Sequence, residues 1–192
     1  MRKHFLFQST RSLDRAHFEN ALKKMGIPEA EVHYQDDRHG EFVLEGNHET
    51  KIDPTLLLPR EEWGSSLTLM VAHQHTLFED RLLPKALSWF PNQVVYPVDI
   101  LMKEMFSFGD FSSYVPLHDL FENVPRDLLE TAGAFLRCGL DESLAAERLF
   151  IHRNTFIYRL KKFIDITNLD IRDYHNALLL ELYFQTGSGR AT

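Results

Sequence analysis

With 192 residues, 44% of them hydrophobic and 26% charged, the chain can bury the core of one or two domains. No apolar run approaches the roughly 18 residues of a membrane span, and the run at residues 5–7 is shorter than the about seven residues of a secretory signal. A single cysteine, Cys138, excludes an internal disulfide framework, so we expect a cytoplasmic protein. The net charge of −7 is carried by residues 1–125, because nine Lys and Arg balance nine Asp and Glu in residues 126–192.

The first part of the chain mixes the patterns of strands and helices. Residues 67–72 are the clearest strand, because they form a short apolar run that contains β-formers. Turn-forming residues at 36–40 predict a hairpin between two short strands, and Ser12 is expected to cap the first helix. The expected elements are strands at 3–8, 31–35, 41–45 and 67–72, helices at 12–25, 77–90 and 98–108, and loops at 46–64 and 108–113.

From residue 125 onward the pattern is that of helices alone. We expect Asn123 to cap the first of them, with Pro125 in its first turn and Gly139 just after its end. Its apolar residues recur on one face, as in an amphipathic helix. A second, short helix starts at Asp141 or Ser143, and a third starts at about residue 152 or 153. The four expected helices cover about 125–138, 141–149, 153–166 and 173–184.

The second and third of these helices are separated by about three residues around Ile151, which is the arrangement of a helix-turn-helix. In a helical projection of the third helix, one side is apolar and must pack on the preceding helices. The opposite side is polar, cationic and free of acids through Lys162, which suits the major groove of DNA. A solvated face in a helical bundle is the alternative interpretation of the same pattern. The apolar side comprises Phe156, Leu160, Phe163 and Ile164, and the polar side comprises Asn154, Thr155, Tyr158, Lys161 and Lys162, with Arg159 on the flank.

The string LAAERLFIHRNTFIYRL at 144–160 and its continuation TNLDIRD at 167–173 closely resemble the C-terminal helix-turn-helix of PucR/CdaR-type regulators. The segment is similar, more distantly, to the DNA-binding end of the Fis nucleoid factor. The resemblance implies a recognition helix whose first residues lie close to bases and phosphates and whose later cations lie close to the backbone. Two residues depart from the pattern: Ile157 replaces a usual arginine, and Phe150 stands where other helix-turn-helix proteins often have glycine. The residues thus expected to bind DNA are His152, Arg153, Asn154, Thr155, Tyr158, Arg159, Lys161 and Lys162.

Other kinds of site have weaker support. His73 and His75 have a spacing that would place two rings on one face of a strand, as some zinc sites require, with further histidines at 33, 39 and 48. The sequence does not place the remaining ligands, so scattered surface histidines are the simpler interpretation and we expect no metal and no cofactor. The serines at 65–66 lack the Gly-x-Ser-x-Gly spacing, and no phosphate-binding glycine motif occurs, so we do not expect an enzyme.

The sequence therefore predicts an α+β N-terminal domain and an all-α helix-turn-helix C-terminal domain. We expect a regulatory or dimerisation domain at 1–120, a DNA-binding domain at 121–186 and a flexible tail at 187–192. The predicted function is a sequence-specific transcription regulator that binds the major groove of double-stranded DNA as a homodimer. An upstream sensor of an effector that the sequence does not identify follows from the family architecture alone. The alternative, supported by Ile157, is a protein-interaction or scaffold module whose helix-turn-helix no longer binds DNA. The aromatic residues expected in the dimer interface are Phe106, Phe108, Phe111 and Tyr114.

Overall fold

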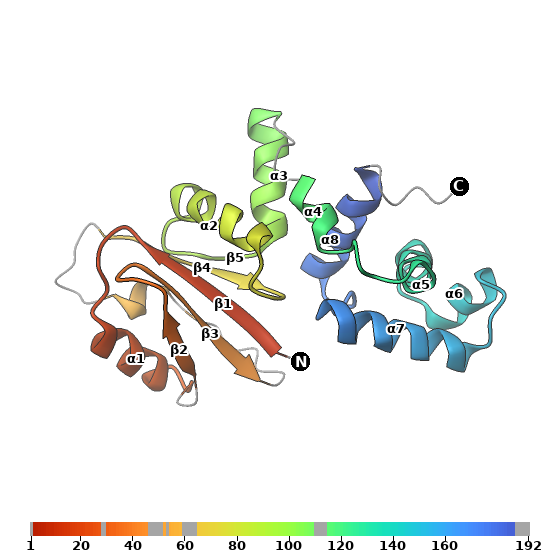
Figure 1. The fold of residues 1–192 in the computed structure, drawn as a ribbon, viewed down its shortest axis with the longest axis horizontal. Helices are drawn as coiled ribbons and strands as arrows, with labels where there is room; N and C mark the ends of the chain where they lie inside the picture. Colours follow the sequence, from red (N-terminus) through yellow and green to blue (C-terminus); the bar gives the residue numbers. More distant parts are fainter. Residues whose placement is uncertain are drawn as a thin grey trace. The chain divides into compact units, whose positions relative to one another are not determined.

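The computed structural model describes residues 2–27, 30–45, 52, 54–58, 65–109 and 115–186. The chain forms two compact units, Met1–Gly109 and Asp110–Thr192. The first contains a β-sheet with helices and the second contains helices only, which confirms the predicted fold class (Figure 1). The first helix of the second unit, α4 (Val115–Asp119), precedes the boundary expected at residue 120. The roles assigned to residues 1–120 and 121–186 remain proposals.

The N-terminal unit is built on a five-stranded sheet with the order β2-β3-β1-β4-β5. The central strand β1 pairs in antiparallel fashion with β3 and β4, and β2 pairs with β3 in the same way. The edge strand β5 runs parallel to β4. The sequence did not predict the two-residue strand β5, because so short a segment between two prolines carries no periodic signal. The strands are β1 (Arg2–Ser9), β2 (Glu31–Tyr34), β3 (His39–Glu45), β4 (Leu67–Ala72) and β5 (Val94–Val95).

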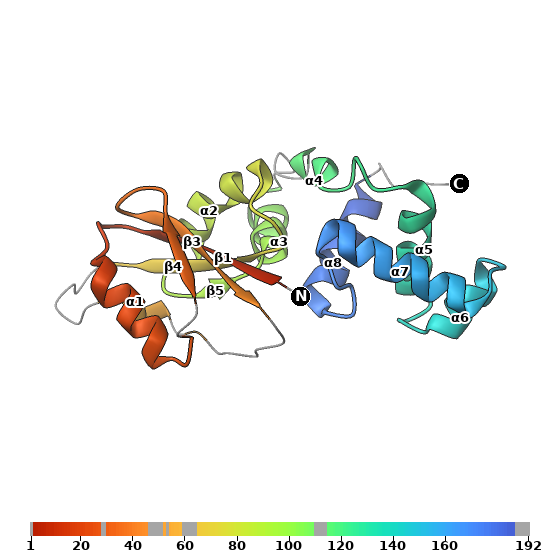
Figure 2. The same cartoon turned by 60° about the horizontal axis from the view of Figure 1, so that its bottom comes forward.

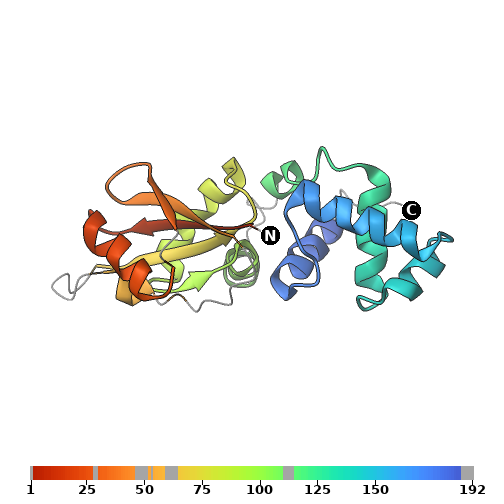
Figure 3. The ribbon, with the colours of Figure 1, turned by 90° about the horizontal axis from the view of Figure 1, so that it is seen from below.

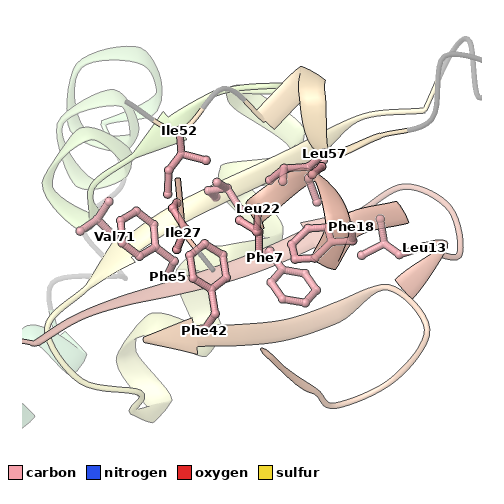
Figure 4. Close-up of a cluster of buried hydrophobic side chains, with 13 residues drawn as sticks. Phe5, Phe7, Leu13, Phe18, Leu22, Ile27, Phe42, Ile52, Leu57 and Val71 are labelled. Atoms are coloured by element: carbon pink, nitrogen blue, oxygen red, sulfur yellow. The ribbon is translucent and has the colours of Figure 1, made fainter. Parts of the chain in front are cut away.

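Alternation along the strands divides the sheet into two apolar faces. Phe5 is paired with Phe42 on one side and with Val71 on the other, so these side chains share one face. Helix α1 (Arg15–Lys24) covers this face with Phe18 and Leu22, and together they form the cluster in Figure 4. Helices α2 (Leu77–Trp89) and α3 (Pro97–Phe108) lie on the opposite face (Figure 2). None of the described helices is long and apolar enough to cross a membrane.

Local polar contacts decide where the helices of this unit begin. Helix α1 is capped by Asp14, which accepts a hydrogen bond from the backbone N–H of His17 at 3.0 Å. The prediction that Ser12 is the cap was wrong, because its hydroxyl donates to the side chain of Asp37 in the β2–β3 hairpin. Helix α2 starts with a capping box of Thr76 and Glu79. Burial raises the pKa of Glu79 to about 7, against the opposing effect of its hydrogen bonds with Thr76.

His75 is held between two carboxylates in the loop that joins β4 to α2. Its Nδ1 lies 3.0 Å from Oε2 of Glu41, and its Nε2 lies 2.7 Å from Oδ1 of Asp80. Burial opposes the charge on the ring, but Asp80 and Glu41 outweigh it and raise the pKa of His75. His73 and His75 lie after the end of β4, so they do not share a strand face as the zinc alternative assumed. Among the residues that the structure describes, no group of three or more His, Cys, Asp or Glu is placed to hold a metal ion.

We expect His75→Gln to destabilise the N-terminal unit at about pH 5.5 and to have little effect at about pH 8. Because the folded-state pKa of His75 is raised, its charged pairs stabilise the fold below the unfolded value of about 6.5. This contribution, on the order of 1 kcal/mol for partly exposed pairs, is lost as the pH rises through the folded-state pKa. Urea unfolding followed by tryptophan fluorescence measures it, because both tryptophans, Trp63 and Trp89, precede Gly109.

The matched control is His33→Gln, which removes a histidine whose single ion pair, with Glu31, is longer and far more exposed to solvent, and it should show a much smaller pH dependence. Equal destabilisation by His75→Gln at both pH values would contradict the charged pairing.

Candidate nucleic-acid interface

The candidate interface lies in the helical unit, where the short helix Glu142–Arg148 is followed by the long helix Arg153–Thr167 (Figure 3). Proline at 125 occupies the N-cap position of the helix that precedes these two, which begins at Arg126. The predicted cap at Asn123 was therefore wrong, whereas the predicted end at Gly139 is confirmed by its left-handed φ of 65°. The helices are α5 (Arg126–Arg137), α6 (Glu142–Arg148), α7 (Arg153–Thr167) and α8 (Tyr174–Gln185).

Left-handed residues set the bends before and after α6, Gly139 and Leu140 before it and Phe150 after it. Leu140 has a φ of 65°, and its backbone N–H donates to the carbonyl of Phe135 at 2.9 Å. Asp141 then caps α6 by accepting from the backbone N–H groups of Ser143 and Leu144. After α6, Phe150 has a φ of 55° and a side chain that is 97% exposed. Phe150 thus occupies the left-handed position that other helix-turn-helix proteins often give to glycine.

His152 begins the long helix. It is the N-cap of α7, and its Nδ1 accepts a hydrogen bond from the backbone N–H of Asn154 at 3.2 Å. Because Nδ1 is the acceptor, the neutral ring carries its proton on Nε2. His152 itself is exposed, so the Nε2–H group is the part of the ring that can donate to a ligand.

Burial of one stripe of α7 fixes which side of the helix faces outward. Phe156, Leu160 and Phe163 are buried, and the ring centroid of Phe156 lies 5.8 Å from that of Phe135 on α5. Ala145 on α6 is fully buried, as expected for a small residue where two helices approach closely. The buried stripe is the one that the sequence predicted, with Ile164 half-buried at its edge.

Helix α8 completes the core. Its Tyr183 packs on Phe121 with ring centroids 4.4 Å apart, and Phe184 lies so close to Gly133 that an added Cβ would meet its ring at 3.0 Å. In the link between α7 and α8, the guanidinium of Arg172 donates two hydrogen bonds to the carboxylate of Asp170, each at 2.8 Å. Burial opposes the charge of Asp170, but Arg172 outweighs it and lowers the pKa of that carboxyl. The apolar character of α8 is thus explained by the core of its own unit.

The outward side of α7 carries the residues that the sequence assigned to DNA binding. Its side chains differ in exposure: Tyr158 is 63% exposed, whereas the side chain of Arg159 is only 29% exposed. Ile157, at 39% exposure, lies on the edge of this side. The exposed members of the predicted set are His152, Arg153, Asn154, Thr155, Tyr158, Lys161 and Lys162.

Two acids from the preceding helices pair with the arginines of α7. Nη2 of Arg153 donates to Oε2 of Glu142 on α6 at 3.1 Å. Nε of Arg159 lies 3.3 Å from Oδ2 of Asp127 on α5. The sequence did not predict either acid as part of the site, because they lie on other helices and only the packing brings them beside α7.

A short helix, a tight turn and a long helix with an outward cationic face define a helix-turn-helix domain. Residues 128–186 match the family described as the PucR C-terminal helix-turn-helix domain. The predicted resemblance is thereby confirmed.

Several known proteins contain a similar segment. The uncharacterized protein Rv2242 of Mycobacterium tuberculosis is 35% identical over 91 residues, which make up 45% of this chain and 22% of that protein. The proline-responsive transcriptional activator PutR of Bacillus subtilis is 36% identical over 61 residues, 32% of this chain and 15% of PutR. A solved structure, the regulator of polyketide synthase expression from Bifidobacterium adolescentis, has a TM-score of 0.47 at 18% identity and covers 100% of this chain and 83% of that one. The chain spans from 15% to 34% of the length of the curated relatives it matches.

We expect Phe150→Gly to raise the free energy of unfolding of the helical unit by about 0.5–1 kcal/mol. The left-handed backbone costs a residue with a Cβ about 1 kcal/mol, part of which glycine returns through the entropy of the unfolded chain. The exposed ring contributes little packing that could be lost. Thermal unfolding followed by far-UV circular dichroism measures the change.

Phe150→Ala is the matched control, because it removes the same ring and keeps the Cβ, and it should not stabilise. If the glycine variant is no more stable than the alanine variant, backbone strain at residue 150 is not the reason.

Proposed function

We propose that this protein is a transcription regulator that binds double-stranded DNA through α7, with sequence preference. The observation that carries the proposal is the outward face of α7, which presents Asn154, Tyr158, Lys161 and Lys162 at the open corner of a PucR-type helix-turn-helix domain. A helix with a buried apolar stripe and a cationic outer side fits the width of the major groove. Among the proteins with similar segments, PutR is by its name a transcriptional activator, which favours the same class of function here.

The position of each residue along α7 suggests its contact. His152, Arg153, Asn154 and Thr155 stand at the N-terminal end of α7, the part of a recognition helix that approaches base edges. The amide of Asn154 can form a bidentate pair with adenine, and the guanidinium of Arg153 can do so with guanine. We propose that the later residues contact the phosphate backbone, which orients a protein on the duplex without specifying sequence. They are Tyr158, Arg159, Lys161 and Lys162.

A protein-interaction module without DNA binding is the second candidate. Ile157 favours it, because an apolar side chain with 39% exposure replaces a usual cation of this family at the edge of the outward face. The two candidates differ in binding to duplex DNA at low salt, which the interaction module lacks. If the 192-residue chain retains no duplex from a random-sequence pool at low salt, that result favours the interaction module and contradicts our proposal.

The N-terminal unit is proposed to regulate or to dimerise, because one recognition helix covers too few base pairs to select a site in a genome. Two helices in a homodimer would enter successive major grooves about 34 Å apart on an inverted repeat. Phe106 and Phe108 of the proposed interface are 74% and 61% exposed, and Phe111 and Tyr114 lie outside the described residues. By analogy with the proline-responsive PutR, we propose a small-molecule effector of this unit.

We expect the double variant Lys161→Ala, Lys162→Ala to weaken binding to all duplexes alike. Both side chains are exposed on the outward face and would neutralise phosphates, so the slope of log K against log salt should become shallower by about 0.9 for each phosphate that is no longer neutralised. Fluorescence anisotropy with a labelled duplex over a range of salt concentrations measures the slope. Lys23→Ala with Lys24→Ala, an exposed lysine pair at the end of α1, is the control that should leave it unchanged.

We expect Asn154→Ala to reduce sequence discrimination and not the salt slope. Loss of a bidentate contact between a side chain and a base reduces the free-energy difference between the preferred and other sequences by roughly 1–3 kcal/mol. That contribution does not come from released counterions, so the salt slope should not change. The measurement compares affinity for a duplex selected from a random pool with affinity for its scrambled sequence. An unchanged preference would mean that this side chain does not contact a base.

A further inference from the structure

We propose that Glu142 and Asp127 are positioning residues that act as built-in counterions of the α7 face. In the free protein Glu142 forms an ion pair with Arg153, and Asp127 forms one with Arg159. Duplex DNA has to displace these two carboxylates from the arginines, which reduces binding to DNA of arbitrary sequence. The inference rests on the proposed DNA-binding function and adds the residues that limit non-specific binding.

The geometry divides the cations of α7 into two kinds. Arg153 and Arg159 lie on the flanks of the outward face, within 3.1 Å of Glu142 and 3.3 Å of Asp127 respectively. Lys161 and Lys162 are exposed, and in the described part of the chain no acid forms an ion pair with either of them. Only the two lysines therefore present charge that is not already balanced by a neighbouring carboxylate.

The ion pairs are weak enough to open. The side chains of Arg153 and Glu142 are 60% and 33% exposed, and those of Arg159 and Asp127 are 29% and 50% exposed. Water and salt screen pairs with this exposure, so DNA can compete for the guanidinium groups.

Competition has a consequence that can be measured. When an arginine leaves a carboxylate for a phosphate, it exchanges one oxyanion for another. The arginine neutralises one phosphate, which releases condensed cations, but the freed carboxylate stays beside the DNA and adds one negative charge to the same region, which holds cations there. The two effects cancel, so a paired arginine adds little to the salt dependence of binding, whereas an unpaired cation adds about 0.9 to the slope.

A base edge is affected differently from a phosphate. Arg153 contacts Glu142 through Nη2 alone, whereas guanine offers two acceptors in the major groove and so accepts a bidentate contact. A bidentate contact with the correct base can therefore offset the free energy of the broken ion pair more fully than a single phosphate contact can. The acids penalise phosphate-driven binding more than binding to the preferred sequence.

A purely structural role predicts a different result. Asp127 and Glu142 both lie in the first turn of their helices, where a negative charge stabilises the helix dipole. Loss of that effect lowers the melting temperature, but it does not change the number of ions released when DNA binds. The salt slope therefore distinguishes a counterion from a helix-stabilising charge.

The test uses the 192-residue chain and a labelled duplex of mixed sequence, with Glu142→Gln, Asp127→Asn and both together. We expect each substitution to tighten binding at low salt and to steepen the salt slope by about 0.9, so that a fourfold rise in salt weakens binding about 3.5-fold more than in the unchanged protein. The control is Glu147→Gln, which makes the same change of charge at an exposed position of α6 that pairs with no cation of the described α7. It should leave the slope unchanged.

Arg153→Ala in two backgrounds completes the design. It should leave the salt slope unchanged in the original chain. In the Glu142→Gln chain it should return the steepened salt slope to the value of the original chain. Melting temperatures of all variants establish that they are folded. If the unchanged protein binds duplex DNA and the acid variants keep its slope, this inference is wrong and the proposed function stands. If neither the unchanged protein nor any variant binds duplex DNA at low salt, both are wrong.

Discussion

The arrangement of the helical unit depends on the burial of one stripe of α7 against α5 and α6. Phe156 and Phe163 have no exposed surface, and burying a side chain of this size contributes about 1.5–3 kcal/mol. Ala145 on α6 lets the helices approach closely enough to exclude water from that stripe. A rotation of α7 that exposed these rings would forfeit this energy, so the packing of its apolar side holds its polar side toward solvent.

Besides the buried stripe of α7, the arrangement of the helical unit requires the bends before and after α6, which the backbone conformation sets. Leu140 and Phe150 both adopt left-handed φ values, which side chains with a Cβ disfavour. The fold accepts this cost because the bends bring Ala145 against α7 and leave His152 free to cap it. Strain at two exposed residues is thus offset by burial elsewhere in the same unit.

Electrostatics then decide how a net-acidic chain can offer a cationic face. The outward side of α7 carries Lys161 and Lys162, while carboxylates from α5 and α6 balance its two arginines. Charge close to a ligand matters more than the sum over the chain, because salt screens interactions beyond a Debye length of about 10 Å. The small excess of unbalanced charge agrees with the proposed binding of DNA by sequence more than by attraction to phosphate alone.

The sequence by itself determined the strand at 67–72, the long helices, the buried stripe of α7 and the family of the helical domain, because periodicity and a specific local string are properties of neighbouring residues. Only the tertiary structure decided which strands pair and which side chains form hydrogen bonds and ion pairs with each other. The edge strand β5, the bond from Ser12 to Asp37 that leaves Asp14 as the cap of α1, and the carboxylates of Asp127 and Glu142 beside α7 all depend on contacts between distant segments. A local pattern does not record such contacts, since packing in three dimensions selects among the partners that each side chain could have.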